Sequence, residues 1–412
     1  MFPGPTIYAR QDDRVMIKVT NLTPYNLSIQ WHGVRQRLTC WSDGPAYITQ
    51  CPIQAGQSFT YKFTLPNQRG TLFWHAHISW LRATVYGALV IYPKHGVPYP
   101  FDLPDEEHLI ILGEYWLQDI QDLEKHLKET GGGPPSSDAY LINGHPGPLH
   151  NCSKDDMFTI NVRQGKTYLL RIVNAALNME HFFGIANHLM TVVEADGEYT
   201  KPFNTTFLML TPGQTSNVLV KADQPIAKYD MSMTPYMPAK NVPFLELPSY
   251  ALLDYTNSLP SSNSLSFTYH EPILPYLNDT NCKYSSPEKC QGPNGGIFAA
   301  SVIFQDTGSI GTENHPIHLH GFSFYVLGSG LGDFNSTNAV LNLYDPPYRN
   351  TVGVPVGGWT VIRFRADNPG IWFMHCHLEV HTMWGLSMAF LVKNGEGEMQ
   401  TLSHPPPDLP VC

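Results

Sequence analysis

Residues 372–381 read WFMHCHLEVH, which places a cysteine between two histidines and a third histidine four residues further along. Side chains alternate between the two faces of an extended strand. We therefore expect His375 and His377 to point to one face and Cys376 to the other. One metal ion cannot readily bind all three side chains, whereas two metal sites, one on each face, can.

The sequence HPIHLH, which begins at His315, repeats this arrangement. His318 and His320 share one face, so they can join the two histidines that flank Cys376 in a histidine-rich site. His315 lies three residues back and points the opposite way. It can therefore join Cys376 and His381 in a second, smaller site.

Two further pairs extend the histidine-rich site. His75 and His77 flank one alanine, and Gln30 and His32 flank one tryptophan. Each pair has the spacing that puts both side chains on the same face of a strand. The four short motifs together predict one small site and one site with many imidazoles.

The ligand types favour copper. Two imidazoles and one thiolate are typical of a blue-copper site, and the larger site has too many imidazoles for one ion and suits a copper cluster. The backbone joins Cys376 to both neighbouring histidines, which gives electrons a covalent route between centres about 10 Å apart. Zinc is the main rival metal, but the CxxC spacing of structural zinc sites is absent from the sequence. A cupin-like iron site would leave Cys376 unused.

Short runs rich in Val, Ile, Tyr, Phe and Thr recur along the chain, as in RVMIKVTNLT, KTYLLRIVNAA and WTVIRFRADNPG. Their spacing predicts an all-β fold of antiparallel β-sandwiches. Because three segments share an apolar strand, then Asn or Asp and a turn, we expect three similar domains at residues 1–100, 101–260 and 261–412. One helix is predicted near residues 117–129.

Composition limits the partners and the setting. The 412 residues carry a formal charge of -10 without a basic tract, which argues against nucleic acid or an anionic membrane as partner. The sequence contains no apolar run of about 18 residues, so it predicts no transmembrane helix. Six glycosylation sequons in an acidic, proline-rich chain favour an extracellular setting, and the missing signal-peptide features then imply an N-terminus that is incomplete or processed. The sequons begin at Asn21, Asn26, Asn151, Asn204, Asn278 and Asn335.

Four segments resemble those of the multicopper oxidases, and those of the plant laccases most closely: WHGVRQRLTCWSDGPAYITQCPI, GTLFWHAHISWLRATVYGALVIYP, HPIHLHGFSFYVLGSG and WFMHCHLEVHTMWGL. The resemblance covers nearly the whole chain. It implies three cupredoxin-like Greek-key domains, with a trinuclear copper cluster between the first and the third. It also implies a secreted enzyme of the apoplast that acts as a monomer.

By this resemblance the chain binds four copper ions. The type 1 copper takes His315, Cys376 and His381, and Leu386 occupies its axial position. A leucine donates no electrons there, and weak axial ligation raises the redox potential. The histidines implied to hold the type 3 pair are His32, His75, His77, His320, His375 and His377.

The implied reaction has two halves. Phenols or aromatic amines, with lignin precursors as the implied class, give single electrons to the type 1 copper. Four electrons pass along the Cys376 strand, through His375 and His377, and reduce dioxygen to water. The reduction needs protons, and Asp43 is similar to the family's carboxylate near the type 2 copper.

The sequence departs from the family pattern at two places. The type 2 copper should take His318 and a second histidine, but Gln30 stands at the second position, and an amide is a far poorer copper ligand than an imidazole. We therefore expect a poorly occupied type 2 site and impaired dioxygen reduction. The third domain is also short, because CQGPNGGIFAASV runs directly into IFQDTGSIGTENHPIHLHG, so we expect reduced stability.

The resemblance also bears on the cysteines. It implies a bridge between Cys51 and Cys412, which ties the first domain to the third. It implies a local bridge between Cys282 and Cys290 as well. Cys152 has no partner in this pattern, and Cys40 has no role.

Two alternative functions stay open at this point. Ascorbate oxidase is a second enzyme that the residues around the type 1 site do not exclude. A non-catalytic or type-2-depleted secreted copper protein of the same family is the other. Gln30 and the shortened third domain favour it, whereas the intact Cys376 with both type 1 histidines argues against it.

Overall fold

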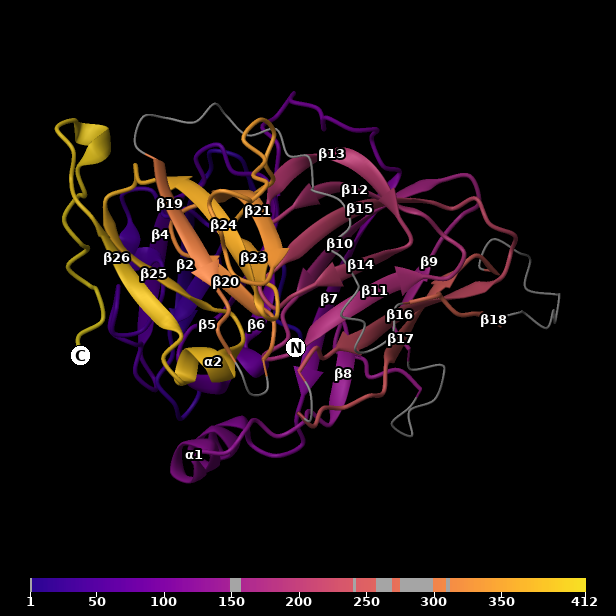
Figure 1. Cartoon of the computed structure of the whole chain (residues 1–412), viewed down its shortest axis with the longest axis horizontal. Coiled ribbons are helices and arrows are strands. Elements are labelled where there is room, and N and C mark those ends of the chain that lie inside the picture. The colour runs from indigo at the N-terminus through magenta and orange to yellow at the C-terminus, as the bar shows by residue number, and fades with distance from the viewer. Residues whose placement is uncertain (1, 149–156, 240–241, 257–268, 275–298, 309–311) are drawn as a thin grey trace.

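A computed structural model describes all residues except 1, 149–156, 240–241, 257–268, 275–298 and 309–311. The described strands form six sheets that follow one another in three groups along the chain (Figure 1). This confirms the predicted all-β class. In this described part, no helix is both long and apolar enough to cross a lipid bilayer.

The N-terminal group consists of a four-stranded sheet, in the order β1-β6-β5-β3, and a two-stranded sheet of β2 and β4. The alternation in SFTYKFT buries Phe59, Tyr61 and Phe63 and turns the residues between them outward, as the period of a strand requires. The elements are β1 (Ile7–Arg10), β2 (Arg14–Thr20), β3 (Ile29–His32), η1 (Cys40–Ser42), β4 (Ser58–Thr64), β5 (Gly70–Ala76), η2 (Ser79–Ala83) and β6 (Tyr86–Tyr92).

The middle group packs the sheet β13-β12-β15-β10-β7-β8 against the sheet β14-β11-β16-β17-β9 around a core of apolar side chains. Its strands are β7 (Glu106–Tyr115), β8 (Ala139–Ile142), β9 (Thr159–Asn161), β10 (Thr167–Asn174), β11 (Glu180–Ile185), β12 (Met190–Ala195), β13 (Glu198–Thr205), β14 (Phe207–Leu210), β15 (Thr215–Lys221), β16 (Lys228–Tyr236) and β17 (Ser249–Asp254). β18 (Tyr269–His270) lies beyond residue 260 and pairs with β16. The domain boundaries themselves stay a prediction.

The predicted helix is present as α1 (Ile120–Thr130). The side chain of Asp119 accepts hydrogen bonds from the backbone N–H groups of Gln121 and Asp122, which caps the first turn. Gly131 ends the helix in the left-handed conformation that glycine adopts without strain.

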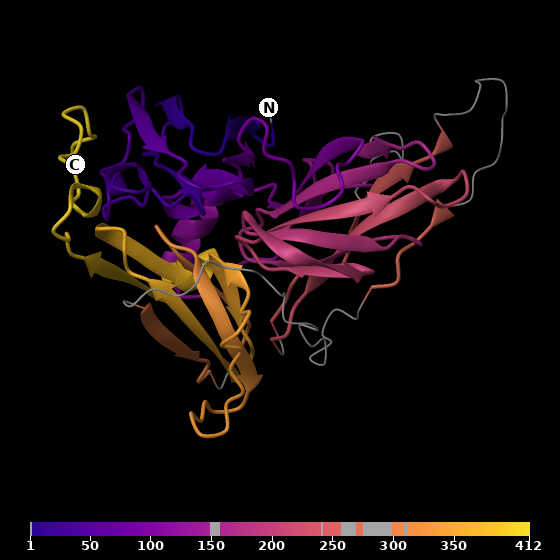
Figure 2. The same cartoon turned by 90° about the horizontal axis from the view of Figure 1, so that it is seen from above.

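The C-terminal group has the sheets β19-β24-β21-β22 and β23-β20-β25-β26. It lies against the N-terminal group (Figure 2). Its elements are β19 (Ala299–Gln305), β20 (His315–Leu319), β21 (Phe324–Leu331), β22 (Tyr348–Arg349), β23 (Thr351–Val354), β24 (Gly358–Arg365), β25 (Gly370–Cys376), α2 (Glu379–Met383), β26 (Ser387–Val392) and η5 (Glu398–Gln400).

A disulfide between Cys51 and Cys412 joins the N-terminal and C-terminal groups, as the resemblance implied. Cys40 is buried and free. The expected pair of Cys282 and Cys290 lies outside the described residues, and so does the position predicted to lack a partner, Cys152.

A second joint between the groups is the guanidinium of Arg82, in η2, whose side chain is only 2% exposed. It donates hydrogen bonds to the carbonyl oxygens of Ala176 and Leu177 in the middle group and of His377 in the C-terminal group. It also pairs with the carboxylate of Glu379 at 3.1 Å. One planar fork of donors therefore holds all three groups together beside a histidine of the predicted copper cluster.

We expect Arg82→Met to lower the free energy of unfolding by about 3–5 kcal/mol, because it leaves the Glu379 carboxylate and three carbonyl oxygens without their buried donor. Arg82→Lys keeps the charge but not the fork, so its loss should be smaller. Arg365→Met is the control, since this side chain is 60% exposed, and its effect should stay within about 0.5 kcal/mol. Chemical denaturation followed by tryptophan fluorescence measures all three. If Arg82→Met unfolds at the same denaturant concentration as the parent chain, the joint has no such role.

Candidate metal centre

Three groups of side chains bring potential metal-binding atoms within 4.8 Å of one another. We call the first the thiolate cluster and the other two the histidine clusters. The thiolate cluster is His315, Cys376 and His381; the histidine clusters are His32, His75 and His377, and His77, His320 and His375. Every member was predicted from the sequence to belong to a metal site.

In the thiolate cluster, two imidazoles face one sulfur atom. The Nδ1 atoms of His315 and His381 lie 3.1 Å apart, and they lie 3.9 Å and 3.5 Å from Cys376 Sγ. The two rings come from the start of β20 and from α2, and the cysteine ends β25. Two nitrogens and a sulfur that converge in this way fit the trigonal ligand set of a blue-copper site.

The side chains of β25 diverge as the alternation predicts. His375 Nε2 lies 3.2 Å from His320 Nε2 in one histidine cluster, and His377 Nε2 lies 3.2 Å from His32 Nδ1 in the other. Cys376, between them, faces the thiolate cluster. Three consecutive residues therefore reach three different groups of ligands: His375 and Cys376 end β25, and His377 follows it directly.

The backbone orients several rings in the histidine clusters. His75 Nδ1 lies 2.8 Å from the carbonyl oxygen of Ala76, and His375 Nδ1 lies 2.8 Å from that of Cys376. Each ring then donates its Nδ1–H and leaves Nε2 as a free acceptor. The Nε2 atoms of His75 and His77 are buried without a hydrogen-bond partner among the described residues. Such orphaned nitrogens fit a site that binds metal ions.

Burial sets the protonation of these ligands. It lowers the pKa of His320 to about 3 and that of His381 to about 4, and it holds the pKa of the remaining histidines of the two histidine clusters well below 6.5. The imidazoles are therefore neutral at pH 7 and available as metal ligands. Burial raises the pKa of the Cys376 thiol, so a metal ion must displace its proton to obtain the thiolate ligand.

His318 and Gln30 stand between the two histidine clusters. Gln30 Nε2 lies 3.2 Å from His318 Nε2 and 3.1 Å from His320 Nδ1. Gln30 Oε1 is buried and has no hydrogen-bond partner in the described chain. His318 thus faces an amide where the family pattern calls for a second imidazole, and this pair does not fit the type 2 copper as well as the other sets fit theirs.

Asp43 is buried beside the histidine cluster of His77, His320 and His375. Its Oδ2 atom lies 2.8 Å from His320 Nδ1, and burial raises the pKa of its carboxyl well above 3.8.

The placement of Leu386 does not match its predicted role as simply. Its carbonyl oxygen accepts from the backbone N–H of Cys376, while the residue as a whole is 43% exposed. Its axial position toward the metal stays a prediction.

Three residues that the sequence analysis did not single out help to hold the histidine rings in place: Asn350, Thr351 and Asp196. His318 Nδ1 lies 2.9 Å from the carbonyl oxygen of Asn350, and His32 Nε2 lies 3.2 Å from Thr351 Oγ1. The carboxylate of Asp196, in the middle group, accepts from the backbone N–H groups of Asn350 and Thr351. These contacts are long-range and polar, and no local motif marks them.

Comparisons with known proteins agree with this geometry. Three models described as multicopper oxidase match residues 1–96, 106–258 and 278–396. The laccase of Botrytis aclada superimposes with a TM-score of 0.77 at 26% identity, over 98% of this chain and 84% of that one. Fet3p, a multicopper oxidase that functions in iron import, superimposes with the same TM-score and identity. The match covers 98% of this chain and 88% of Fet3p. These matches confirm the predicted cupredoxin-like fold.

Curated plant proteins are more similar in sequence. Laccase-6 of Arabidopsis thaliana is 45% identical over 511 residues, which cover 100% of this chain and 90% of the relative. Laccase-11 of the same plant is 47% identical over 507 residues, with 100% and 91% covered. The 511 aligned positions exceed the 412 residues of this chain by 99, so the relative has that many positions without a counterpart between the matched ends. The chain therefore belongs to the multicopper oxidase family, as a laccase-type oxidase of the plant laccase group with copper as its cofactor.

Proposed function

We propose that this chain takes single electrons from small phenolic molecules, with lignin precursors as the substrate class, and uses four of them to reduce dioxygen to water. The single observation that carries this proposal is the divergence of His375, Cys376 and His377, at the end of β25, into three ligand clusters. Copper, when bound, supplies the one-electron redox chemistry.

The ligand roles follow the clusters. The thiolate cluster would hold the type 1 copper, and the two histidine clusters would hold the type 3 pair. His318 would hold the type 2 copper with Gln30 as a poor second ligand. The backbone from Cys376 to each neighbouring histidine is the covalent path between electron entry and oxygen reduction. Asp43 Oδ2, with its raised pKa, would hold a proton within reach of His320.

Electrons enter where the ligands approach solvent. The side chains of His315 and His381 are 21% and 11% exposed, whereas those of the histidine clusters are nearly all buried. The ring of Trp384, which is 57% exposed, lies 5.7 Å from that of His381. The Glu313 carboxylate lies 3.8 Å from His381 Nε2, and burial raises its pKa to about 7. An aromatic substrate could pack against Trp384 while its hydroxyl hydrogen-bonds to Glu313.

The same proposal includes the location. The Cys51–Cys412 disulfide is of the kind that persists in oxidising compartments, and exposed sequon asparagines suit a secreted glycoprotein. We propose that the chain acts outside the cell, in the apoplast.

A second candidate function is a copper protein that accepts electrons but reduces dioxygen poorly or not at all. Gln30 is the observation that favours it, since its amide faces His318 where an imidazole is needed. The complete thiolate cluster is retained in both functions. The two differ in the type 2 copper content and in oxygen consumption.

We expect Cys376→Ser to abolish the intense blue absorption and to reduce phenol oxidation to background, because the thiolate ligand and the start of the electron path are both lost. Cys40→Ser is the matched control: Cys40 is also buried and free but belongs to none of the three clusters. Visible absorption and oxygen uptake with syringaldazine measure both variants. Blue colour in folded Cys376→Ser, or its loss in folded Cys40→Ser, would contradict the assignment.

We expect Gln30→His to raise the type 2 copper content and the rate of dioxygen reduction, because even an indirect ligand contact is worth about 10–100-fold in metal affinity. Gln164→His, on the surface, controls for adding a histidine. Copper per chain and the type 2 spin-resonance signal are the primary measurements. A full type 2 complement and ordinary turnover in the parent chain would show that Gln30 is an adequate ligand.

A further inference from the structure

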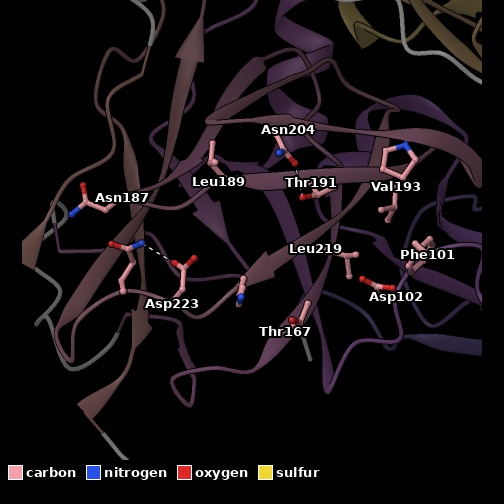
Figure 3. Close-up of a pocket in the computed structure, with 13 residues that line it drawn as sticks. Phe101, Asp102, Thr167, Asn187, Leu189, Thr191, Val193, Asn204, Leu219 and Asp223 are labelled. Atoms are coloured by element: carbon pink, nitrogen blue, oxygen red, sulfur yellow. Dashed lines mark hydrogen bonds between the residues drawn. The ribbon is translucent and has the colours of Figure 1, made fainter.

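An open groove lies on the outer face of the sheet β13-β12-β15-β10, remote in sequence from the copper ligands. It has a volume of about 540 Å³. Asn204, Thr191 and Leu219 are direct neighbours across β13, β12 and β15, and all three line it. Figure 3 shows Asn204 and Thr191 pointing toward one another at its edge.

Asn204 begins one of the predicted glycosylation sequons, Asn204-Thr205-Thr206. The residue is exposed, and its Oδ1 atom accepts a hydrogen bond from Thr191 Oγ1 at 2.7 Å. This contact fixes the amide plane and leaves Nδ2, the atom that receives a sugar, without a hydrogen bond to the described residues. The asparagine is therefore held with its reactive nitrogen available.

The sequon at Asn21 shows the opposite arrangement. Asn21 is fully buried, and its Nδ2 donates to the carbonyl oxygens of Tyr25 and Ile53 at 2.7 Å and 2.9 Å. A sugar on that nitrogen would replace one of its two hydrogens, so at least one of these hydrogen bonds would be lost, and the buried position leaves no room for the sugar. The fold thus distinguishes between two sequons that the sequence alone treats as equal.

The lining of the groove suits an amino sugar. Leu189, which is 57% exposed, and Leu219 offer an apolar floor, while Asp102, Lys221 and Gln224 offer charged and amide groups at the margins. An N-acetylhexosamine has the same mixture: a methyl group and apolar ring face, with hydroxyl groups around the edge. The lining mixes polar and apolar residues in similar measure, as such a sugar does.

We propose that Asn204 carries an N-linked glycan and that its first sugars lie in this groove, against Leu219 and Leu189. The proposal rests on the proposed passage through the secretory pathway. A glycan held in this way ties β13 to β12 and β15 on the face opposite the core of the middle group. It therefore adds stability to this group as well as bulk.

The test uses the full chain, directed into the secretory pathway of a eukaryotic host by an added leader. Treatment with peptide-N-glycosidase in heavy-oxygen water, followed by peptide mass spectrometry, marks each occupied asparagine. We expect Asn204 to be occupied and Asn21 to be unmodified. An unmodified Asn204 in the secreted chain would overturn the proposal.

The contact with the groove is tested with Thr206→Ala, which removes the sequon but keeps Asn204 and Thr191. We expect its melting temperature to fall by about 2–4 °C and the β15 amides to exchange faster with deuterium. Thr337→Ala is the matched control: it destroys the exposed Asn335 sequon, whose asparagine accepts from the Thr337 backbone N–H that alanine keeps. If the two variants melt and exchange alike, the glycan does not lie in the groove. Neither readout uses activity, so an inactive chain tests the proposal equally well.

Discussion

The alternation of side chains along β25 is the constraint on which the copper centre depends. A strand turns consecutive side chains to opposite faces, so Cys376 and its two histidine neighbours cannot converge on one point. β20 pairs antiparallel with β25, with His318 opposite His375 and Ile317 opposite Cys376. This register places His318 and His375 on one face, while Cys376 and His315, at the start of β20, lie on the other. The separation of the two kinds of site therefore follows from backbone geometry and needs no special loop.

Burial of so many imidazoles has a cost that the surrounding polar contacts offset. A buried imidazole must stay neutral or find a partner, and here the Nε2 atoms of His75 and His77 have no hydrogen-bond partner in the described part of the chain. The rings keep their positions because carbonyl groups and side chains hold the opposite nitrogen. Asp196 fixes Asn350 and Thr351, which contact His318 and His32. None of the clusters found among the described residues includes a residue of the middle group, yet Asp196 in that group positions Asn350 and Thr351, which contact predicted ligands.

Much of the site could be predicted from the sequence, because most of its ligands come in pairs two residues apart, at the ends of β5, β20 and β25. In an extended conformation the motifs HAH, HLH and HCH place both histidines on one face, so the thiolate cluster and one histidine-rich site could be predicted with the all-β class. The division of that site into two histidine clusters could not. Arg82 and Asp196 could not. Each acts on backbone groups of a distant segment, and a lone Arg or Asp in a turn has no spacing that names its partner. Asp43 was singled out, but its contact with His320 depends on how two groups of sheets pack.

The difference in exposure between the two ends of the centre decides what Gln30 can change. His315 and His381 reach solvent, whereas Gln30 is 1% exposed and contacts His318 and His320 at the buried end. Among the described contacts, its amide reaches His318 and His320 and no member of the thiolate cluster, so we expect the entry of electrons to be independent of it. We expect a substitution at Gln30 to change dioxygen reduction only. It leaves the ligands and the burial of the thiolate cluster unchanged. Under the proposed ligand roles, the two halves of the oxidase reaction can be lost separately, and the cluster assigned to electron entry has all three of its ligands.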